Sequence, residues 1–158
     1  MNIQDIIGLD TNKTKEVADK LNLLLADYSL FYQNVRGYHW NIKGDEFFEL
    51  HEKFEELYNS LAEKIDEIAE RLVTLGYTPW HKQSVYLEKA SIKESDTQKD
   101  GRKSVESILR AFKSILASQR ALLDLSDNIG DEGTNALMSD YISEQEKTVW
   151  MYAAFLSE

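Results

Sequence analysis

The sequence predicts an all-α protein built on a bundle of four long helices, and three observations lead to this prediction. Of the 158 residues, 42% are apolar, and three Trp, eight Tyr and six Phe supply large side chains for a core. One proline and seven glycines leave few interruptions, which permits long helices and argues against a turn-rich β-sandwich. Apolar residues also recur at spacings of three and four along four segments. We therefore expect residues 1–158 to form one α-helical domain.

The first helix is expected to begin near Asp10 or Thr11. Lys43-Gly44 is its predicted stop, because glycine tolerates the left-handed conformation that ends helices, and Asp45 is the predicted N-cap of the next helix. The apolar face of the first helix consists of Val17, Leu21, Leu24, Leu25, Tyr28, Phe31, Tyr32, Val35 and Tyr38.

The second helix is predicted to cover about thirty residues and to be closed by Gly76 and Pro79. Between Gly76 and Gly101 the chain is polar, but the group Val85, Tyr86, Leu87 and Ala90 indicates a short helix inside this connection. The apolar stripe of the second helix consists of Leu50, Phe54, Leu57, Leu61, Ile65, Ile68, Leu72 and Leu75.

Two more helices are predicted after the connection, separated by the glycine-bearing segment from Asn128 to Asp131. Four long helices with one long middle connection are the ferritin-like pattern, in which that connection runs the length of the bundle. The third helix carries Val105, Ile108, Leu109, Phe112, Ile115, Leu116, Leu122 and Leu123. The fourth carries Leu137, Met138, Tyr141, Ile142, Val149, Tyr152 and Phe155.

The net charge and the lack of cysteine limit which partners and which metal sites the protein is expected to have. With 28 acidic and 18 basic residues the net charge is −10, which opposes attraction to nucleic acid or anionic lipid and favours cations. Without cysteine, a metal must be held by His, Asp and Glu, which suits iron or manganese. The apolar run Ile6-Ile7 is too short for a signal peptide or a membrane span, so a cytoplasmic protein without membrane contact is expected.

The histidines exclude the usual ferritin-like di-iron site within one bundle. That site needs a Glu-x-x-His pair on each of two helices. In this chain the residues three before His39, His51 and His81 are Arg, Phe and Thr.

A different constellation lies on the second helix, where His51 with Glu55, and Asp66 with Glu70, each stand one turn apart on one face. These residues lie roughly 130° around the helix from the apolar stripe, so they face away from the core. Such a face is ordinarily only solvated. Less polar neighbours favour an interface instead, and they are Tyr58, Ala62 and Ala69.

A two-fold axis could join the two pairs. His51 and Asp66 are about 22 Å apart along a straight helix, so they cannot share a metal within one chain. In an antiparallel pair of identical helices, residues that face each other across the two-fold axis have a constant mean residue number. Residues 51 and 70 have the same mean as residues 55 and 66, so both pairs meet in one such dimer. Three residues near that centre, Asn59, Ser60 and Ala62, are short enough for close approach, and His39 is placed to add a nitrogen ligand near His51.

The chain strongly resembles the Dps or miniferritin family over most of its length. The resemblance is carried by Tyr38-His39-Trp40-Asn41-Ile42-Lys43-Gly44, Phe47-Phe48, Leu50-His51-Glu52, Phe54-Glu55, Leu57-Tyr58, Asp66, Ala69-Glu70-Arg71, Trp150-Met151-Tyr152 and Ala154-Phe155-Leu156.

This resemblance implies a hollow homododecamer with ferroxidase centres at its two-fold interfaces. His39, His51 and Glu55 come from one subunit, and Asp66 and Glu70 from the other. Family members oxidise Fe²⁺, commonly with hydrogen peroxide, and store ferric iron in the cage. The family often has Asp at the position of Glu55, so the longer side chain affects the second iron position.

The resemblance also bears on iron passage and on DNA. It implies an acidic three-fold pore at Asp127, Asp131 and Glu132, for which the alternative is a helix N-cap with solvated loop acids. Trp40 is expected to pack in the core or an interface, with interception of stray oxidising equivalents as the alternative. No lysine-rich tail is evident, so DNA binding is expected to be weak or absent. The competing functions are a nucleoid-binding protein that uses iron incidentally and a structural bundle with a vestigial site.

Overall fold

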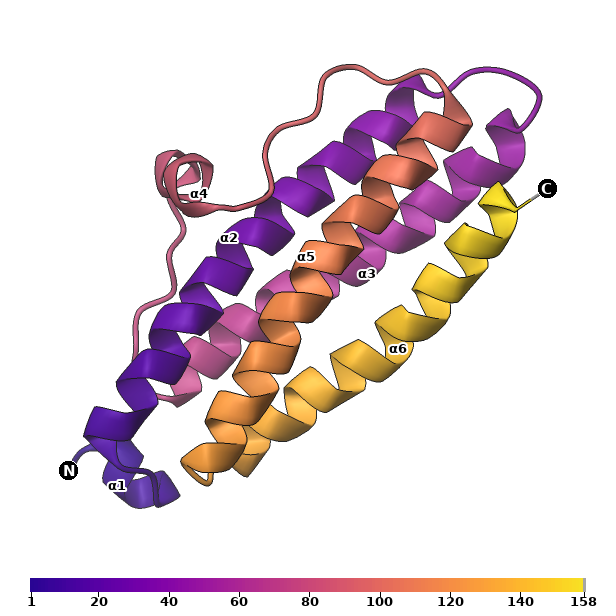
Figure 1. Ribbon diagram of the computed structural model, residues 1–158. Coiled ribbons are helices and arrows are strands. Elements are labelled where there is room, and N and C mark those ends of the chain that lie inside the picture. Colours follow the sequence, from indigo (N-terminus) through magenta and orange to yellow (C-terminus); the bar gives the residue numbers. More distant parts are fainter. Residues whose placement is uncertain (158) are drawn as a thin grey trace.

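The computed structural model describes residues 1–157, and its centre is a bundle of four long helices (Figure 1). They are α2 (Thr11–Asn41), α3 (Phe47–Thr74), α5 (Gly101–Asn128) and α6 (Glu132–Leu156). The two hairpins, α2 with α3 and α5 with α6, form the most extensive contacts, and α2 also packs on α5. Residues 1–157 contain no strand, so the predicted all-α, ferritin-like bundle is confirmed.

The long connection runs from one end of the bundle to the other along α2 (Figure 1). It contains the short helix α4 (Gln83–Lys89), as the sequence predicted, and α4 packs against α2. This connection makes α3 and α5 run in the same direction. None of the helices in the described part of the chain is both long and apolar enough to cross a membrane.

The predicted start of α2 is correct, but the helix ends at Asn41, before the predicted stop at Lys43-Gly44, and the predicted start of α3 is also wrong. Asp10 caps α2, and its side chain accepts hydrogen bonds from the amides of Asn12 and Lys13. The prediction that Asp45 caps α3 is wrong, because the chain turns over Gly44, whose φ is +109°, and the helix begins at Phe47. Glu46 occupies the N-cap position and makes no side-chain capping bond.

A short N-terminal helix, α1 (Ile3–Ile7), was not predicted. It lies at the end of the bundle where α3 terminates (Figure 1). Gln4 is buried and its Nε2 donates to the Leu75 carbonyl at 2.7 Å, which satisfies a carbonyl at the C-terminus of α3. Asn2 as N-cap and Gly8 after the last residue are the local signals for this helix.

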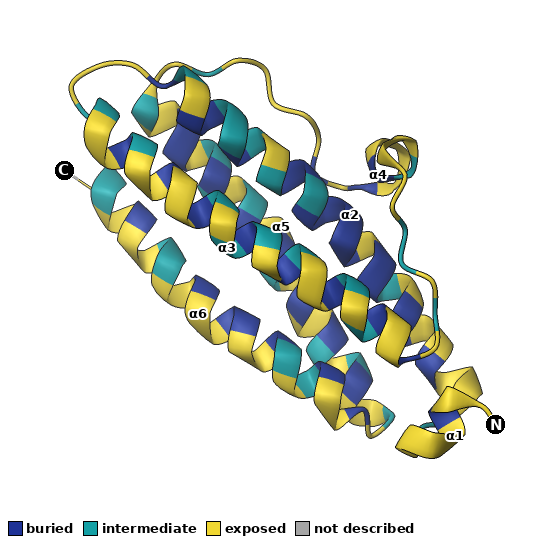
Figure 2. Ribbon diagram, turned by 180° about the vertical axis from the view of Figure 1, so that it is seen from behind, coloured by how far each residue is buried: buried dark blue, intermediate teal, exposed yellow. Residues whose placement is uncertain are grey.

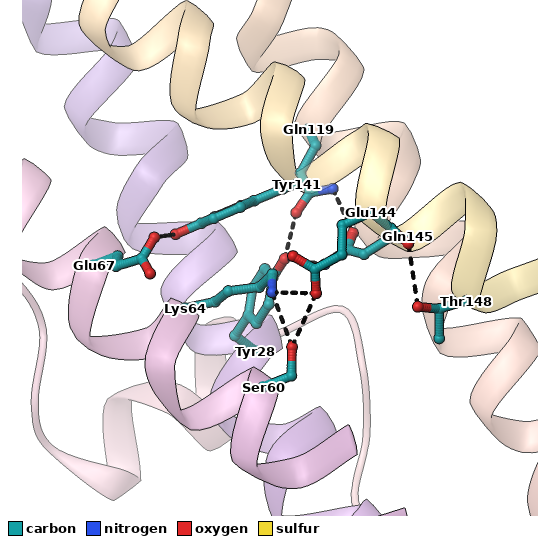
Figure 3. Close-up of polar contacts among 9 residues, drawn as sticks. All are labelled: Tyr28, Ser60, Lys64, Glu67, Gln119, Tyr141, Glu144, Gln145 and Thr148. Atoms are coloured by element: carbon teal, nitrogen blue, oxygen red, sulfur yellow. Dashed lines mark hydrogen bonds and ion pairs between the residues drawn. The ribbon is translucent and has the colours of Figure 1, made fainter. Parts of the chain in front are cut away.

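The core consists of the helix faces that point towards one another (Figure 2). The predicted stripe of α3 is buried except at Ile65, which is half-buried. Lys64 takes a buried place instead, and its Nζ donates to Ser60 Oγ and Glu144 Oε1, both at 2.9 Å. This contact and the Tyr141 to Glu67 hydrogen bond of 2.8 Å tie α3 to α6 (Figure 3).

A ring of three buried polar side chains lies deeper in the core (Figure 3). The Tyr28 hydroxyl donates to Gln119 Oε1, Gln119 Nε2 donates to Gln145 Oε1 at 2.7 Å, and Gln145 Nε2 donates back to the Tyr28 oxygen at 2.6 Å. Burial raises the pKa of Tyr28 above its ordinary value, so the hydroxyl stays protonated and can donate. The ring links α2, α5 and α6.

Candidate metal centre

His39 and His51 are brought together by the α2–α3 hairpin. His39 lies in the last turn of α2, and His51 lies in the second turn of α3. Their rings stack with centroids 3.8 Å apart and an interplanar angle of 11°. Phe47 stacks on the other side of His51, with ring centroids 4.8 Å apart. The predicted proximity of the two histidines is therefore present within one chain.

Each histidine is held by the backbone of the other. His39 Nδ1 lies 2.6 Å from the His51 carbonyl oxygen, and His51 Nδ1 lies 2.8 Å from the His39 carbonyl oxygen. A carbonyl oxygen can only accept, so Nδ1 carries the proton in both rings. In the neutral imidazole, Nε2 then has a free lone pair, which is the form that binds a metal ion. Two candidate nitrogen ligands are thus fixed in orientation and tautomer.

Glu55 follows His51 by one turn of α3 and is exposed. The Tyr58 hydroxyl donates to Glu55 Oε1 at 3.3 Å, and the Tyr58 ring meets His39 edge to face at 5.4 Å between centroids. Burial, the nearby Glu55 charge and this hydrogen bond raise the pKa of Tyr58, so it remains a neutral donor. Tyr58 therefore contacts two candidate ligands, a role that the sequence analysis did not assign. The signal was its place three residues after Glu55 on the same face.

Asp66 and Glu70 lie towards the other end of α3 and are exposed. Because α3 is continuous from Phe47 to Thr74, the separation of about 22 Å between His51 and Asp66 along the helix applies. Within residues 1–157, no three His, Asp or Glu side chains gather closely enough to hold a metal ion. One chain thus presents two separate groups, a histidine half-site (His39, His51 and Glu55) and an acidic half-site (Asp66 and Glu70).

The face between the half-sites differs from the prediction at one residue. Tyr58, Ala62 and Ala69 are half-buried, whereas Ser60 Oγ bonds to Glu144 at 3.2 Å and therefore points towards α6. Ser60 follows His51 by nine residues, which places it about 180° around the helix from His51. It therefore cannot contact a partner on the face that carries the candidate ligands.

Trp40 is not part of the core of the single chain. Its side chain is 56% exposed, and the Arg36 guanidinium lies 4.7 Å from its ring centroid. The expected core position is wrong, and the interface position stays a prediction.

The three pore candidates separate into two kinds. Asp127 and Glu132 are exposed. Asp131 is only 1% exposed, and its Oδ1 accepts from Arg71 at 2.7 Å and from the Thr134 amide at 3.0 Å. Asp131 is the N-cap of α6 and half of a buried ion pair. It serves the fold, as the alternative interpretation proposed, and the pore candidates reduce to Asp127 and Glu132.

Comparisons with known proteins agree with this architecture. A family profile described as a ferritin-like domain matches residues 18–158. The DNA protection during starvation protein of Porphyromonas gingivalis is 40% identical over 156 residues, which cover 99% of this chain and 98% of the relative. An uncharacterized Haemophilus influenzae protein is 53% identical over 148 residues, or 94% of this chain and 92% of the relative.

Solved structures give the same result. The crystal structure of a Dps protein from Vibrio cholerae O1 is described as a member of a broad superfamily of ferritin-like diiron-carboxylate proteins. It superposes with a TM-score of 0.94 at 56% sequence identity and covers 96% of this chain and 95% of that chain. A Dps protein from Bacillus brevis superposes with a TM-score of 0.90 at 35% identity, covering 94% and 100% of the two chains.

Proposed function

Because the chain belongs to the Dps family of ferritin-like proteins, we propose that it is a miniferritin: it oxidises Fe²⁺ between subunits and stores ferric iron in a hollow dodecamer. The observation that supports this most directly is the reciprocal bonding of His39 and His51. With both Nδ1 atoms bonded to backbone carbonyls, each imidazole keeps its Nε2 atom free. The two imidazoles are suited to coordinating a metal ion through Nε2.

The donor set fits iron as the substrate. Imidazole nitrogen binds Fe²⁺, and the carboxylates of Glu55, Asp66 and Glu70 favour the harder Fe³⁺. Few protein ligands would leave coordination positions for the oxidant. Glu55 is one methylene longer than Asp, so we expect weaker binding at the second iron position than at the first.

The centre requires a second copy of the chain. An antiparallel pair of α3 helices would bring residue 51 near residue 70 of its partner, and residue 55 near residue 66, twice per dimer. Tyr58, Ala62 and Ala69 lie between the half-sites and are half-buried in the single chain. We propose that this strip is the two-fold contact.

Hydrogen peroxide is the proposed oxidant. Two Fe²⁺ ions supply two electrons, and hydrogen peroxide with two protons is reduced to two water molecules. Pairing the electrons in this way avoids release of hydroxyl radical, which would protect the cell. The exposed Asp127 and Glu132, beside the turn between α5 and α6, are proposed to attract Fe²⁺ towards the cage.

The test is anaerobic Fe²⁺ loading followed by peroxide, with ferric absorbance and hydroxyl-radical products measured. Asp66→Ala is expected to slow oxidation about a hundredfold, because it removes a ligand. The matched control is Asp19→Ala, since Asp19 is exposed and, within residues 1–157, its only ion pair is with exposed Lys15. Equal rates for the two variants would overturn the site, and rapid oxidation by a stable monomer would overturn its intersubunit character.

DNA protection is the second candidate, favoured by the names of relatives such as the DNA protection during starvation protein of Porphyromonas gingivalis. The net charge of −10 repels phosphate, so we expect direct DNA binding to be weak or absent and protection to act through iron. A gel-shift assay of duplex DNA at low salt checks this. A shift at submicromolar protein would contradict it.

A further inference from the structure

A cavity of about 280 Å³ lies between α2, α5 and the extended segment 91–95, and none of the candidate iron ligands lines it. The segment follows α4 and runs along α2 towards the start of α5 (Figure 1). Almost buried side chains form the floor, among them Phe31 and Ile92, which are 1% and 8% exposed. Polar side chains form the rim.

Two side chains of α2 fix the wall of this cavity. Asp27 Oδ1 accepts from the amides of Ser91 at 2.6 Å and Ile92 at 2.9 Å. Two turns further along, Asn34 donates to the Lys93 carbonyl and accepts from the Ser95 amide, both at 2.9 Å. The extended segment is therefore held without help from a ligand, and the cavity is preformed.

The segment separates its charges between two cavities. Lys93 lines the cavity described here, whereas the neighbouring Glu94 and Asp96 line an adjacent cavity of about 320 Å³. The adjacent cavity shares Asn34, Tyr38 and Ser95 with the first. Arg110 of α5 supplies a second cation to the first cavity. Within residues 1–157, neither Lys93 nor Arg110 forms an ion pair, although acidic residues are in excess.

Three side chains of α2 and α5 with hydroxyl groups line the cavity. One is Tyr38, which is only 4% exposed and also lines the neighbouring cavity. Its hydroxyl makes no hydrogen bond within residues 1–157 and stays accessible, because the buried side-chain oxygen without a partner in this part of the chain is Asp131 Oδ2. The hydroxyls of Ser107 and Ser114 line the same cavity, and Ser107 accepts from Arg110 at 2.9 Å.

We propose that this cavity binds a small phosphate monoester. Arg110 and Lys93 supply charge for a dianion, and three hydroxyl groups supply donors for its several oxygens, more than a carboxylate needs. Phe31 and Ile92 contact the organic group of the ester. A volume of about 280 Å³ admits a phosphate with one small ring, below the range of pockets for drug-sized ligands.

The experiment measures binding of phenyl phosphate, inorganic phosphate and benzoate to the iron-free assembled protein by calorimetry. Phenyl phosphate is expected to bind tightest, since only it provides both the dianion and the ring. The double variant Lys93→Gln with Arg110→Gln should weaken it about tenfold or more, and Tyr38→Phe several-fold. The control is Lys113→Gln, because Lys113 is exposed on the same helix and does not line the cavity.

Three results would overturn the proposal. They are equal binding of benzoate and phenyl phosphate, an unchanged affinity in the double variant, and phenyl phosphate binding no tighter than inorganic phosphate. A fourth arm uses duplex DNA: retention of DNA by the wild type and its loss in the double variant, without binding of phenyl phosphate, would assign the cations to a nucleic-acid backbone instead. Iron oxidation is expected to be unchanged in the double variant, which separates this site from the proposed ferroxidase centre.

Discussion

The two halves of the proposed iron centre lie on one helix and are built in different ways. In the histidine half-site, each imidazole is fixed by the carbonyl of the other, and Phe47 stacks on His51. In the acidic half-site, the carboxylates of Asp66 and Glu70 make no hydrogen bond or ion pair within residues 1–157. The comparison indicates that α2 organises the first half, whereas nothing in residues 1–157 organises the second, where we propose that a partner subunit binds.

The prediction with the largest expected effect tests whether the two half-sites of one centre come from different subunits. Two inactive variants are mixed and reassembled. His51→Ala and Asp66→Ala should each be nearly inactive. In a mixed dimer, one centre combines both defects and the other has neither. Random reassembly of equal amounts should therefore restore about a quarter of the wild-type activity, because half of the dimers are mixed and each has one intact centre.

A matched mixture distinguishes complementation from simple refolding. His51→Ala mixed with Glu55→Ala places both defects in the same half-site, so each centre of a mixed dimer keeps one defect. Peroxide-dependent ferric absorbance after reassembly is the measurement. Activity restored equally in both mixtures would contradict the assignment of the half-sites to different subunits.

The second prediction concerns the end of α3 that carries the acidic half-site. Asp131→Ala removes the partner of Arg71 and the N-cap of α6 together. We expect it to lower the free energy of unfolding by about 3 kcal/mol, since a half-buried cation loses its counter-charge and α6 loses its N-cap. Asp127→Ala, at an exposed acid four residues earlier, should change stability by less than about 0.5 kcal/mol and slow iron uptake.

Denaturant unfolding at one fixed subunit concentration measures this difference, because assembly contributes to the apparent stability. If Asp131→Ala leaves stability unchanged but slows uptake as Asp127→Ala does, Asp131 belongs to the pore after all.

The features of the fold and the candidate site that the sequence predicted depend mostly on residues close together in the chain, and most of those that it missed depend on contacts between distant helices. The four helices follow from apolar periodicity, and His51 with Glu55 follow from helical spacing. The burial of Lys64 could not be predicted, because it depends on Glu144 from a helix eighty residues away in sequence. The orientation of the two histidines depends on the α2–α3 hairpin, and Asp131 pairs with Arg71 only after α3 meets α6.

The third prediction concerns how the buried polar ring of the core affects stability at high pH. Burial raises the pKa of Tyr28 in the folded protein, whereas the unfolded chain ionises near its ordinary value of about 10. Above that pH the unfolded state binds fewer protons than the folded state, so the free energy of unfolding falls as the pH rises. Below about pH 10 this contribution is constant.

Denaturation midpoints measured from pH 8 to 11 test whether stability falls as the pH rises. Tyrosinate absorbance is recorded in parallel. Tyr28→Phe should make the alkaline decline shallower while lowering stability at pH 8, because Gln119 and Gln145 lose the third member of their ring. A decline of equal slope in both proteins would assign the effect to other tyrosines.

The smallest expected effect returns to the histidine half-site. Tyr58→Phe removes the hydroxyl that donates to Glu55 at 3.3 Å but keeps the ring against His39. Loss of an outer hydrogen bond to a metal ligand costs about tenfold in affinity at good geometry, and this long bond should cost less, about threefold in Fe²⁺ binding. Anaerobic Fe²⁺ titration measures it, with Tyr32→Phe as the control, since the Tyr32 ring packs on Tyr58. An equal change in both variants would mean that the hydroxyl bonded to Glu55 does not specifically position that carboxylate. Glu55 would then have no fixed support from its own chain, and would resemble the acidic half-site in depending on the partner subunit.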